Sequence, residues 1–583
     1  MSDNGSRVLP ANRLERSNSP WLVPLALVPG LAFMVVFVLR GAYSSGQWRW
    51  TLFDDALISF AYGRTLAETG EWVWFPGADR VQGITNPLWS ALMAIPHVAL
   101  STPSGAIVLM TVFTIVLMLG LSIITYATLL AAGLDRSPAL VAMGAIPFLY
   151  PLTFWTLRGM EVGLIALCGV VMLLALVKIQ DPLTRSRGSW FVLAGLAGTV
   201  AVLTRLDAIV IAATIAAVGF LLGTPQARKA WLLVLAGLAV AIGLVLVFQY
   251  VYWGDYLPNT YRLKVDGIPF DERLTRGLFA TARALPLIAL TALAWQRIRH
   301  QKTSSVLTSA VGGAGAVTAA VIAYSIWTGG DAWEWSLMLN RTVSAGLPLA
   351  LLAWMLATRS SPRIPGWGLL ALAVSGVGLG ATVNPTGVDA RLALIGLALT
   401  SVAALLVWLA PRSAARPTVR SLLLALGFVV ATSAPGALLW VPYGGLNVQE
   451  DQRFAFRAEE LARVTDGDAT IAVMWAGAPG YYSDRATIDM FGKSDRVIAQ
   501  SPPSIDPATG EPYDFVPGHN KWDYEYSVRD LRPDVVFQLG DDRNVAEAEI
   551  LDWGYERRCL ADGWVSYFRT DSPHVRWDLL PVC

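Results

Sequence analysis

The chain contains a succession of long apolar runs, and this feature most constrains its fold. A helix needs about 20 apolar residues to cross the hydrocarbon core of a bilayer. Runs that approach this length lie at 21–39, 104–130, 139–157, 162–178, 190–204, 207–223, 230–252, 280–296, 305–327, 344–358, 366–382, 391–410 and 420–440. Charged residues make up only 15% of the 583 residues, against about a quarter in soluble proteins. The sequence therefore predicts a multi-pass α-helical membrane protein with about 13 transmembrane helices.

Basic residues give these runs an orientation, because Lys and Arg accumulate in cytoplasmic connectors. They fall in every second connector, at Arg7, Arg13, Arg16, Arg136, Lys178, Arg185, Arg187, Arg228, Lys229, Arg297, Arg299, Lys302, Arg359, Arg363, Arg412, Arg416 and Arg420. This alternation requires the stretch 84–100, which Pro87 and Pro96 interrupt, to lie on the membrane surface as an interfacial helix. The prediction is a plasma-membrane protein with a cytoplasmic tail (1–20), a transmembrane core (21–440) with an outer loop (40–103), and an extracytoplasmic region (441–583).

The region after residue 440 is more polar and has a different sequence pattern. A helix-like run, DQRFAFRAEELARVTD, precedes the strand-like segments ATIAVMW, ATIDMF, PDVVFQL and WVSYF, with Gly and Pro between them. This pattern predicts a small extracytoplasmic α/β domain. Cys559 and Cys583 lie in it and can form a disulfide if it faces an oxidising compartment.

The composition also excludes several function classes. The net charge is +1, and the basic residues form no stripe, so nucleic acid is not expected as a partner. Only four His and three Cys residues are present, and they show no spacing of a zinc or iron site. We expect no required cofactor, although paired acids leave room for a divalent metal.

The adjacent acids Asp54 and Asp55 lie in the outer loop, just before a helix-like stretch. An aspartate before a helix is a favoured N-cap, which explains one acid without any function. Neighbours at a helix start point about 100° apart, so the second acid faces elsewhere. We therefore expect at least one of them to be catalytic: Asp55 as general base with Asp54 capping or orienting, or the reverse.

Two pairs of charges lie between apolar runs, Arg158 with Glu161 and Arg205 with Asp207. Charges cost about 2.5 to 3.5 kcal/mol each at the bilayer centre, so these belong at outer helix ends or in a wet cavity. Arg158 and Glu161, at i and i+3, can be a simple local ion pair. Arg205 and Asp207, two residues apart, cannot face one another on a regular helix, which favours a site.

Two further connectors carry charges and aromatic residues. YWGDYLPNTYRLKV includes Asn259, Arg262 and Lys264, and TGGDAWEWSLMLNR includes Asp331, Trp333 and, at its end, Arg341. Tyr, Trp and snorkelling basic residues also mark ordinary membrane interfaces. Basic residues here are nevertheless suited to a lipid-linked phosphate, and Trp to a sugar face. All these groups fall on one predicted side, which indicates an outward-facing polar cavity.

These segments resemble the GT-C superfamily of membrane glycosyltransferases that use polyprenyl-phosphate sugars, and they look like bacterial members related to the mycobacterial terminal arabinofuranosyltransferase. The segments are FDDALISFAYGRTLAETGEWVWFPGADRVQGITNPLW, LRGMEVGL, LTRLDAIV, YWGDYLPNTYRLKV, GGDAWEW, IDMFGKSDRVIA and PGHNKWDYEY. The resemblance implies a GT-C-like membrane core with interfacial helices and a periplasmic C-terminal domain. It also implies that an acid of the first outer loop, here Asp54 or Asp55, is the base.

The resulting hypothesis is transfer of a sugar, expected to be arabinofuranose, from a polyprenyl-phosphate donor to an envelope glycan or glycolipid. Asp54 and Asp55 are the catalytic candidates, and the donor phosphate is expected at Arg205, Arg262, Lys264 and Arg341. The expected substrate-binding residues are Glu161, Asp207, Asn259, Asp331, Trp333, His519 and Lys521. The alternatives are a transporter or flippase of a lipid-linked saccharide, and a non-catalytic subunit for envelope assembly.

Overall fold

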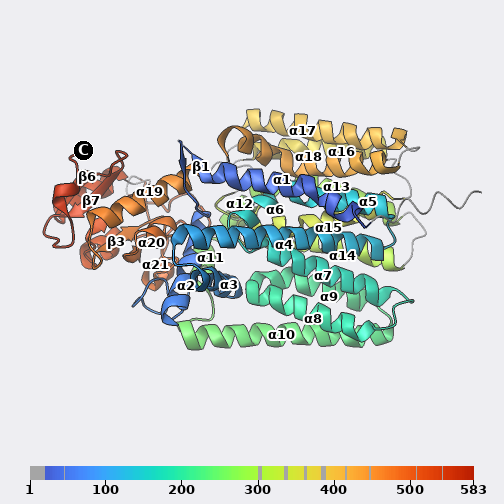
Figure 1. Ribbon diagram of the computed structural model, residues 1–583, viewed down its shortest axis with the longest axis horizontal. Coiled ribbons are helices and arrows are strands. Elements are labelled where there is room, and N and C mark those ends of the chain that lie inside the picture. Colours follow the sequence, from blue (N-terminus) through green and yellow to red (C-terminus); the bar gives the residue numbers. More distant parts are fainter. Residues whose placement is uncertain are drawn as a thin grey trace, which may run out of the picture.

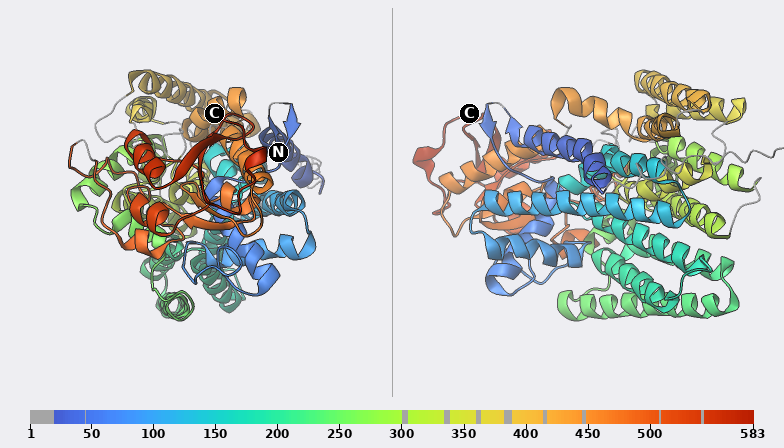
Figure 2. Two further views of the ribbon diagram at one scale, coloured as in Figure 1. Left: turned by 90° about the vertical axis from the view of Figure 1, so that its left-hand side faces the viewer. Right: turned by 45° about the vertical axis from the view of Figure 1, so that its right-hand side comes forward.

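The computed structural model describes residues 20–44, 46–299, 305–333, 339–359, 364–381, 389–413, 417–444, 448–506, 509–540 and 543–583. The tail expected at 1–20 thus lies, except for Pro20, outside the described residues. Long helices run side by side along one axis, and a smaller part of mixed helices and strands covers one end of them (Figures 1 and 2).

The membrane core consists of apolar helices. Eight described helices are long and apolar enough to cross a bilayer: α1 (Leu22–Ala42), α4 (Pro103–Ala131), α7 (Val162–Gln180), α8 (Arg187–Thr204), α10 (Pro225–Trp253), α14 (Ser305–Trp327), α17 (Ala390–Leu409) and α18 (Pro417–Tyr443). The protein is therefore a multi-pass membrane protein, as the sequence predicts. Within this core α7 is central, since 78% of its apolar window is buried, against 28% for the peripheral α10.

Other apolar helices are bent or shorter. Two pairs break in the middle and can each form one span: α5 (Arg136–Ala145) and η3 (Ile146–Phe148) with α6 (Tyr150–Leu157), and α12 (Phe270–Ala282) with α13 (Leu285–Arg299). The shorter ones are η4 (Leu206–Ala208) with α9 (Ile209–Leu222), α15 (Arg341–Ala357), and α16 (Gly366–Ser375) with η6 (Gly376–Gly380); η7 (Ala410–Ser413) follows α17. The total of about 13 crossings stays a prediction.

The segments between spans that matter for the site lie at one end of the core. They are β1 (Tyr43–Ser44), β2 (Gln47–Trp48), α2 (Asp54–Thr69), α3 (Pro87–Ala99) and α11 (Asn259–Val265). The stretch 84–100, expected not to cross, contains α3, which packs against α2 and is not among the candidate spans.

The C-terminal domain, residues 448–583, has a small mixed sheet. Its elements are α19 (Val448–Val464), β3 (Thr470–Val473), α20 (Ala478–Tyr482), β4 (Ala486–Asp489), α21 (Arg496–Gln500), η8 (Glu525–Asp530), β5 (Val535–Val536), α22 (Arg543–Asp552), β6 (Tyr555–Cys559), β7 (Val565–Arg569) and η9 (Trp577–Leu579). The strand order is β4-β3-β5-β7-β6, with β3 parallel to β4 and β5, and β7 antiparallel to β5 and β6.

All four strands expected from the sequence are present in this sheet, so the predicted α/β domain is confirmed. The edge strand β6 was missed, because its sequence YERRC is largely charged and only Tyr555 is buried. Cys559 and Cys583 form a disulfide, the pairing that the sequence allowed. The remaining cysteine, Cys168, is buried in α7.

The predicted sidedness can be measured by cysteine labelling. Leu183, 86% exposed between α7 and α8, is expected inside, and the exposed Glu511 of the C-terminal domain outside. We expect an impermeant maleimide to modify Glu511→Cys in intact cells and Leu183→Cys only after permeabilisation, with the unsubstituted chain as the background control. Modification of both in intact cells would contradict the orientation.

Candidate active site

A cavity of about 340 Å³ lies between one end of the core and the C-terminal domain. Its walls come from α2, loop 83–86, the α8–η4 junction, α11 and the connector before it, the α14–α15 connector, and residues 493 and 517–519 of the C-terminal domain. Ligand pockets typically measure about 300 to 1,000 Å³. Connectors that the sequence assigned to one side of the membrane therefore meet around one ligand-sized space.

Asp54 does not line this cavity and does not cap its own helix. The N-cap of α2 is Phe53, which has no side-chain cap, so the N-cap reading was wrong. The buried Asp54 carboxylate instead accepts hydrogen bonds from the amides of Gly477 (3.2 Å) and Ala478 (2.7 Å) at the start of α20. Position 477 needs glycine, since a Cβ would lie 1.8 Å from the Asp54 carbonyl oxygen. Asp54 thus joins the core to the C-terminal domain.

Asp55, one residue further along α2, lines the cavity and pairs with two cations. Its Oδ2 lies 3.0 Å from Arg341 Nη1, and its Oδ1 lies 2.8 Å from Lys493 Nζ. Burial opposes the charge of Asp55, but Lys493 and Arg341 outweigh burial and hold its pKa well below the usual range. Asp55 is therefore ionised at neutral pH.

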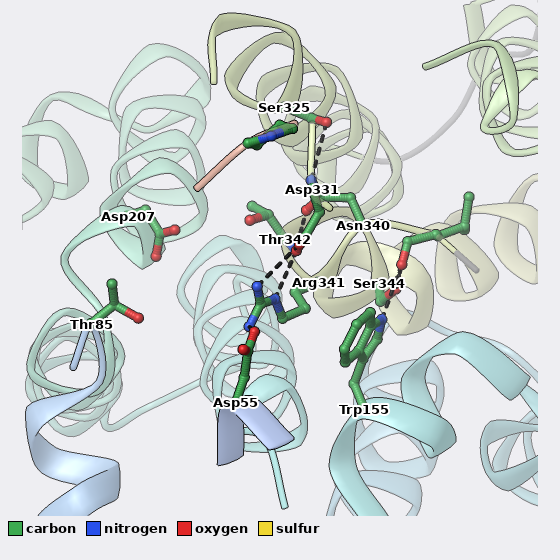
Figure 3. A network of polar contacts seen from close by, with 12 residues as sticks. Asp55, Thr85, Trp155, Asp207, Ser325, Asp331, Asn340, Arg341, Thr342 and Ser344 are labelled. Carbon is green, nitrogen blue, oxygen red and sulfur yellow. Dashed lines mark hydrogen bonds and ion pairs between the residues drawn. The ribbon is translucent and has the colours of Figure 1, made fainter. Parts of the chain in front are cut away.

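Arg341, at the start of α15, bridges Asp55 and Asp331 (Figure 3). Its Nε and Nη2 bind the Asp331 carboxylate at 2.7 and 3.1 Å, and its guanidinium lies over the Trp155 ring. The turn before Asp331 contains Gly329 and Gly330 with φ of +75° and +83°, which glycine adopts without strain. The GGD sequence thus places Asp331 against Arg341.

Arg205 and Asp207 do not lie on one regular helix, as the sequence analysis had assumed. α8 ends at Thr204 and Arg205 is extended, so the two residues lie across a helix break. They face one another after all, with Nε–Oδ1 and Nη2–Oδ2 distances of 2.8 and 2.7 Å. Arg205 Nη1 also binds the fully buried Glu161 at 2.8 Å. Arg205 and Asp207 line the cavity, and Glu161 lies behind them.

Arg158 and Glu161 do not form the local ion pair that their spacing suggested. Arg158 turns toward the C-terminal domain, where its Nη2 lies 2.7 Å from Asp451 Oδ2, and it donates to the carbonyls of Thr51 and Leu52. Arg158 therefore holds the outer loop to α19, away from the cavity lining.

Lys264, on α11, lines the cavity and lies beside Gly518. Its side chain forms no hydrogen bond or ion pair among the described residues, unlike those of Arg205, Arg341 and Lys493. Burial lowers its pKa, against the attraction of Asp331. A lysine so placed gains most from an anionic ligand.

The two other α11 candidates lie outside the cavity lining. Arg262 forms ion pairs with Asp255 at 2.8 Å and Asp266 at 3.0 Å. Asn259 is buried and donates to the Gly492 carbonyl oxygen at 3.2 Å. Arg262 is thus already paired with two acids, and Asn259 binds the C-terminal domain.

Two C-terminal candidates lie in different places. His519 lines the cavity beside Trp333, whereas Lys521 is buried and donates to the Ala499 carbonyl oxygen at 3.0 Å, off the cavity lining. Burial lowers the pKa of His519 to about 3, so its ring is neutral. Its Nδ1 contacts the Pro517 carbonyl oxygen at 3.2 Å. The Nε2 atom has no partner in the described part of the chain.

Sequence reasoning missed Lys493. It lies in the segment IDMFGKSDRVIA after β4, and its partner Asp55 is 438 residues earlier. No local spacing relates the two, so only the fold brings them together. The one available signal was that this segment is among those that resemble the GT-C superfamily.

The structure also limits where a metal ion would find ligands. In the described ranges, Asp55, Asp207 and Asp331 are each paired with Arg or Lys. A group of His and Asp ligands occurs elsewhere, on the C-terminal domain, at Asp466, Asp468 and His574. The cavity acids are thus already neutralised by basic side chains.

Comparisons with known proteins agree with this fold. ArnT from Cupriavidus metallidurans in the apo state has a TM-score of 0.57 at 16% identity, covering 94% of this chain and 97% of that chain. The same protein bound to undecaprenyl phosphate gives 0.53 at 17% identity, covering 95% and 99%. Archaeoglobus fulgidus oligosaccharyltransferase reaches only 0.46 at 13% identity, covering 97% and 75%.

The chain thus has the GT-C-like fold expected from its sequence, a multi-pass membrane core with a C-terminal α/β domain. In sequence, a family described as a domain of unknown function (DUF8728) matches residues 446–572. No curated protein matches the chain.

Replacing Asp54 tests its role as an anchor. An asparagine side chain has one acceptor oxygen, so Asp54→Asn leaves a buried amide of Gly477 or Ala478 unpaired, at a cost of about 1 to 3 kcal/mol. We expect a lower thermal midpoint in detergent and faster proteolysis of the C-terminal domain. Glu68→Gln, an exposed acid on the same helix, is the control and should change stability by less than about 0.5 kcal/mol. Equal behaviour of the two variants would contradict the anchoring role.

The low pKa of His519 makes stability depend on pH. The unfolded state binds a proton near pH 6.5 and the folded state only near pH 3, so stability falls as the pH drops below about 6.5. Between pH 7 and 5 we expect His519 to contribute a loss on the order of 1–2 kcal/mol. The thermal midpoint of wild-type protein should fall more over this range than that of His519→Gln. A smaller fall of the thermal midpoint for wild-type protein than for His519→Gln would show that His519 is charged in the folded state.

Proposed function

We propose that the chain is a membrane glycosyltransferase that moves a sugar from a polyprenyl monophosphate to a hydroxyl of an extracytoplasmic envelope glycan or glycolipid. One observation carries the proposal: the ionised acid Asp55 lines the same cavity, at the end of the membrane core, as Lys264, a lysine that forms no ion pair among the residues that the structure describes. A lysine ammonium is well suited to bind a phosphate. The undecaprenyl phosphate bound to ArnT, a protein of the same fold, supports a carrier of this class.

In this proposal the charge of each cavity residue determines its role. Asp55 accepts the proton of the acceptor hydroxyl, and Lys264 binds the negatively charged phosphate of the donor. The neutral His519 and Trp333 form part of the wall that faces the sugar, to which Trp333 offers an apolar face. Arg205 and Arg341 hold the surrounding carboxylates in place.

The identity of the donor sugar and the need for a metal ion are two separate parts of the proposal. We propose decaprenyl-linked arabinofuranose as the first donor to test, on the strength of the sequence motifs that resemble arabinofuranosyltransferases. A monophosphate donor needs no metal bridge, and the cavity acids are paired with basic residues. We therefore propose that transfer continues in the presence of EDTA.

The direct test uses purified protein in detergent with a panel of polyprenyl-phosphate sugars, with and without EDTA. We expect one donor to yield a transferred sugar, and Asp55→Asn to lower the rate by about 100-fold or more, since general bases contribute about 10²- to 10⁴-fold. Glu68→Gln, on the solvent side of α2, should keep the wild-type rate.

Three outcomes would contradict the proposal. A full rate in a folded Asp55→Asn protein would remove the catalytic assignment. Substrate movement in sealed vesicles without any transfer in detergent would identify a transporter or flippase, and failure to bind every polyprenyl-phosphate sugar would favour an assembly subunit.

A further inference from the structure

The C-terminal domain, which matches a family of unknown function, supplies part of the cavity. Lys493 and residues 517–519 line it, and Lys493 Nζ lies 2.8 Å from Asp55 Oδ1. Burial opposes the charge of Lys493, but Asp55 outweighs burial and raises its pKa above the usual value. Lys493 is therefore a cation within reach of both the acid and the enclosed space.

The two cations that contact Asp55 differ in the number of other contacts that hold them in place. Arg341 binds Asp331 through two nitrogens as well as Asp55, so it is fixed whether or not Asp55 is charged. Lys493 makes its one hydrogen bond among the described residues to Asp55. Its ammonium can therefore leave by breaking a single contact.

The backbone around Lys493 is anchored while the side chain is not. The Gly492 carbonyl oxygen accepts from Asn259 Nδ2, and the Ser494 amide donates to Asp489 Oδ2 at 2.7 Å. Gly83 packs directly against the Lys493 carbonyl oxygen. Only the flexible four-carbon stem of the lysine is left to swing within the cavity.

The proposed reaction moves one negative charge between two groups that line this cavity. The acceptor O–H bond breaks and its proton passes to Asp55, while the acceptor oxygen bonds to the anomeric carbon. The bond from that carbon to the phosphate oxygen breaks, and its electron pair stays on the phosphate. Asp55 thus goes from one negative charge to none, and the phosphate goes from one, as a diester, to two, as a monoester.

We propose that Lys493 is a charge-exchange residue: it neutralises Asp55 in the ligand-free protein and shifts to the phosphate as the phosphate becomes a dianion. This inference rests on the proposed function and assigns to the C-terminal domain a direct part in binding the carrier. Lys264 pairs with the charge that the phosphate carries as a diester. Lys493 pairs with the second charge, which the phosphate gains when the sugar leaves. Departure of Lys493 also releases Asp55 from one of its two cations, which makes it a better base.

The test measures binding of undecaprenyl monophosphate, mostly a dianion at pH 7.5, and of a singly charged polyprenyl phosphodiester, to full-length protein in detergent. We expect Lys493→Met to weaken binding of the monophosphate by about 10- to 100-fold, the range for a charge-assisted hydrogen bond, and binding of the diester by much less. Arg529→Met, which removes an exposed cation from the same domain, should change neither.

A second variant, Asp55→Asn, tests the same role of Lys493 if Lys493→Met folds poorly. Asp55→Asn removes the competing carboxylate, so monophosphate binding should become several-fold tighter, and the double variant with Lys493→Met should lose that gain. Weaker or unchanged binding by folded Asp55→Asn protein, or equal binding by wild type and Lys493→Met, would overturn the charge-exchange role alone. Wild-type protein that binds neither lipid would instead remove the proposed function and this inference with it.

Discussion

Compensation of buried charge is the constraint on which this structure depends. Four basic side chains, Arg205, Lys264, Arg341 and Lys493, line one cavity with Asp55, Asp207 and Asp331. A buried ion without a partner costs several kcal/mol, so each charge must meet an opposite one or a ligand. Three of the cations are paired at 2.7 to 3.0 Å, whereas Lys264 forms no ion pair among the described residues, and in the proposed function it binds the carrier phosphate.

The same constraint connects the C-terminal domain to the core. The tandem aspartates act in different directions: Asp54 binds backbone amides at the start of α20, and Asp55 pairs with Lys493. Arg158 adds a buried ion pair to Asp451. The domain is thereby fixed over the cavity, and its own residues complete the walls. Docking and site formation are consequences of the same few contacts.

Much of the fold could be predicted because membrane helices and short apolar strands leave local patterns in the sequence. Apolar length indicated the candidate spans, and short strand-like segments between Gly and Pro indicated β3, β4, β5 and β7. Basic connectors also grouped the segments that meet at the cavity. Partners could not be predicted, since they depend on distant contacts. The break after Thr204 lets Arg205 meet Asp207, and Gly159, with φ of +94°, lies in the turn that separates Arg158 from Glu161. The pairing of Lys493 left no local pattern, because its partner lies near the other end of the chain.

In the proposed function, the cavity binds the phosphate of a polyprenyl carrier through Lys264. The most direct measurement is a structure, by electron cryomicroscopy, of the protein in nanodiscs with saturating polyprenyl monophosphate. We expect a phosphate oxygen within about 3 Å of Lys264 Nζ, inside the cavity beside Asp55. A phosphate bound elsewhere, with Lys264 still without an anionic partner, would contradict it.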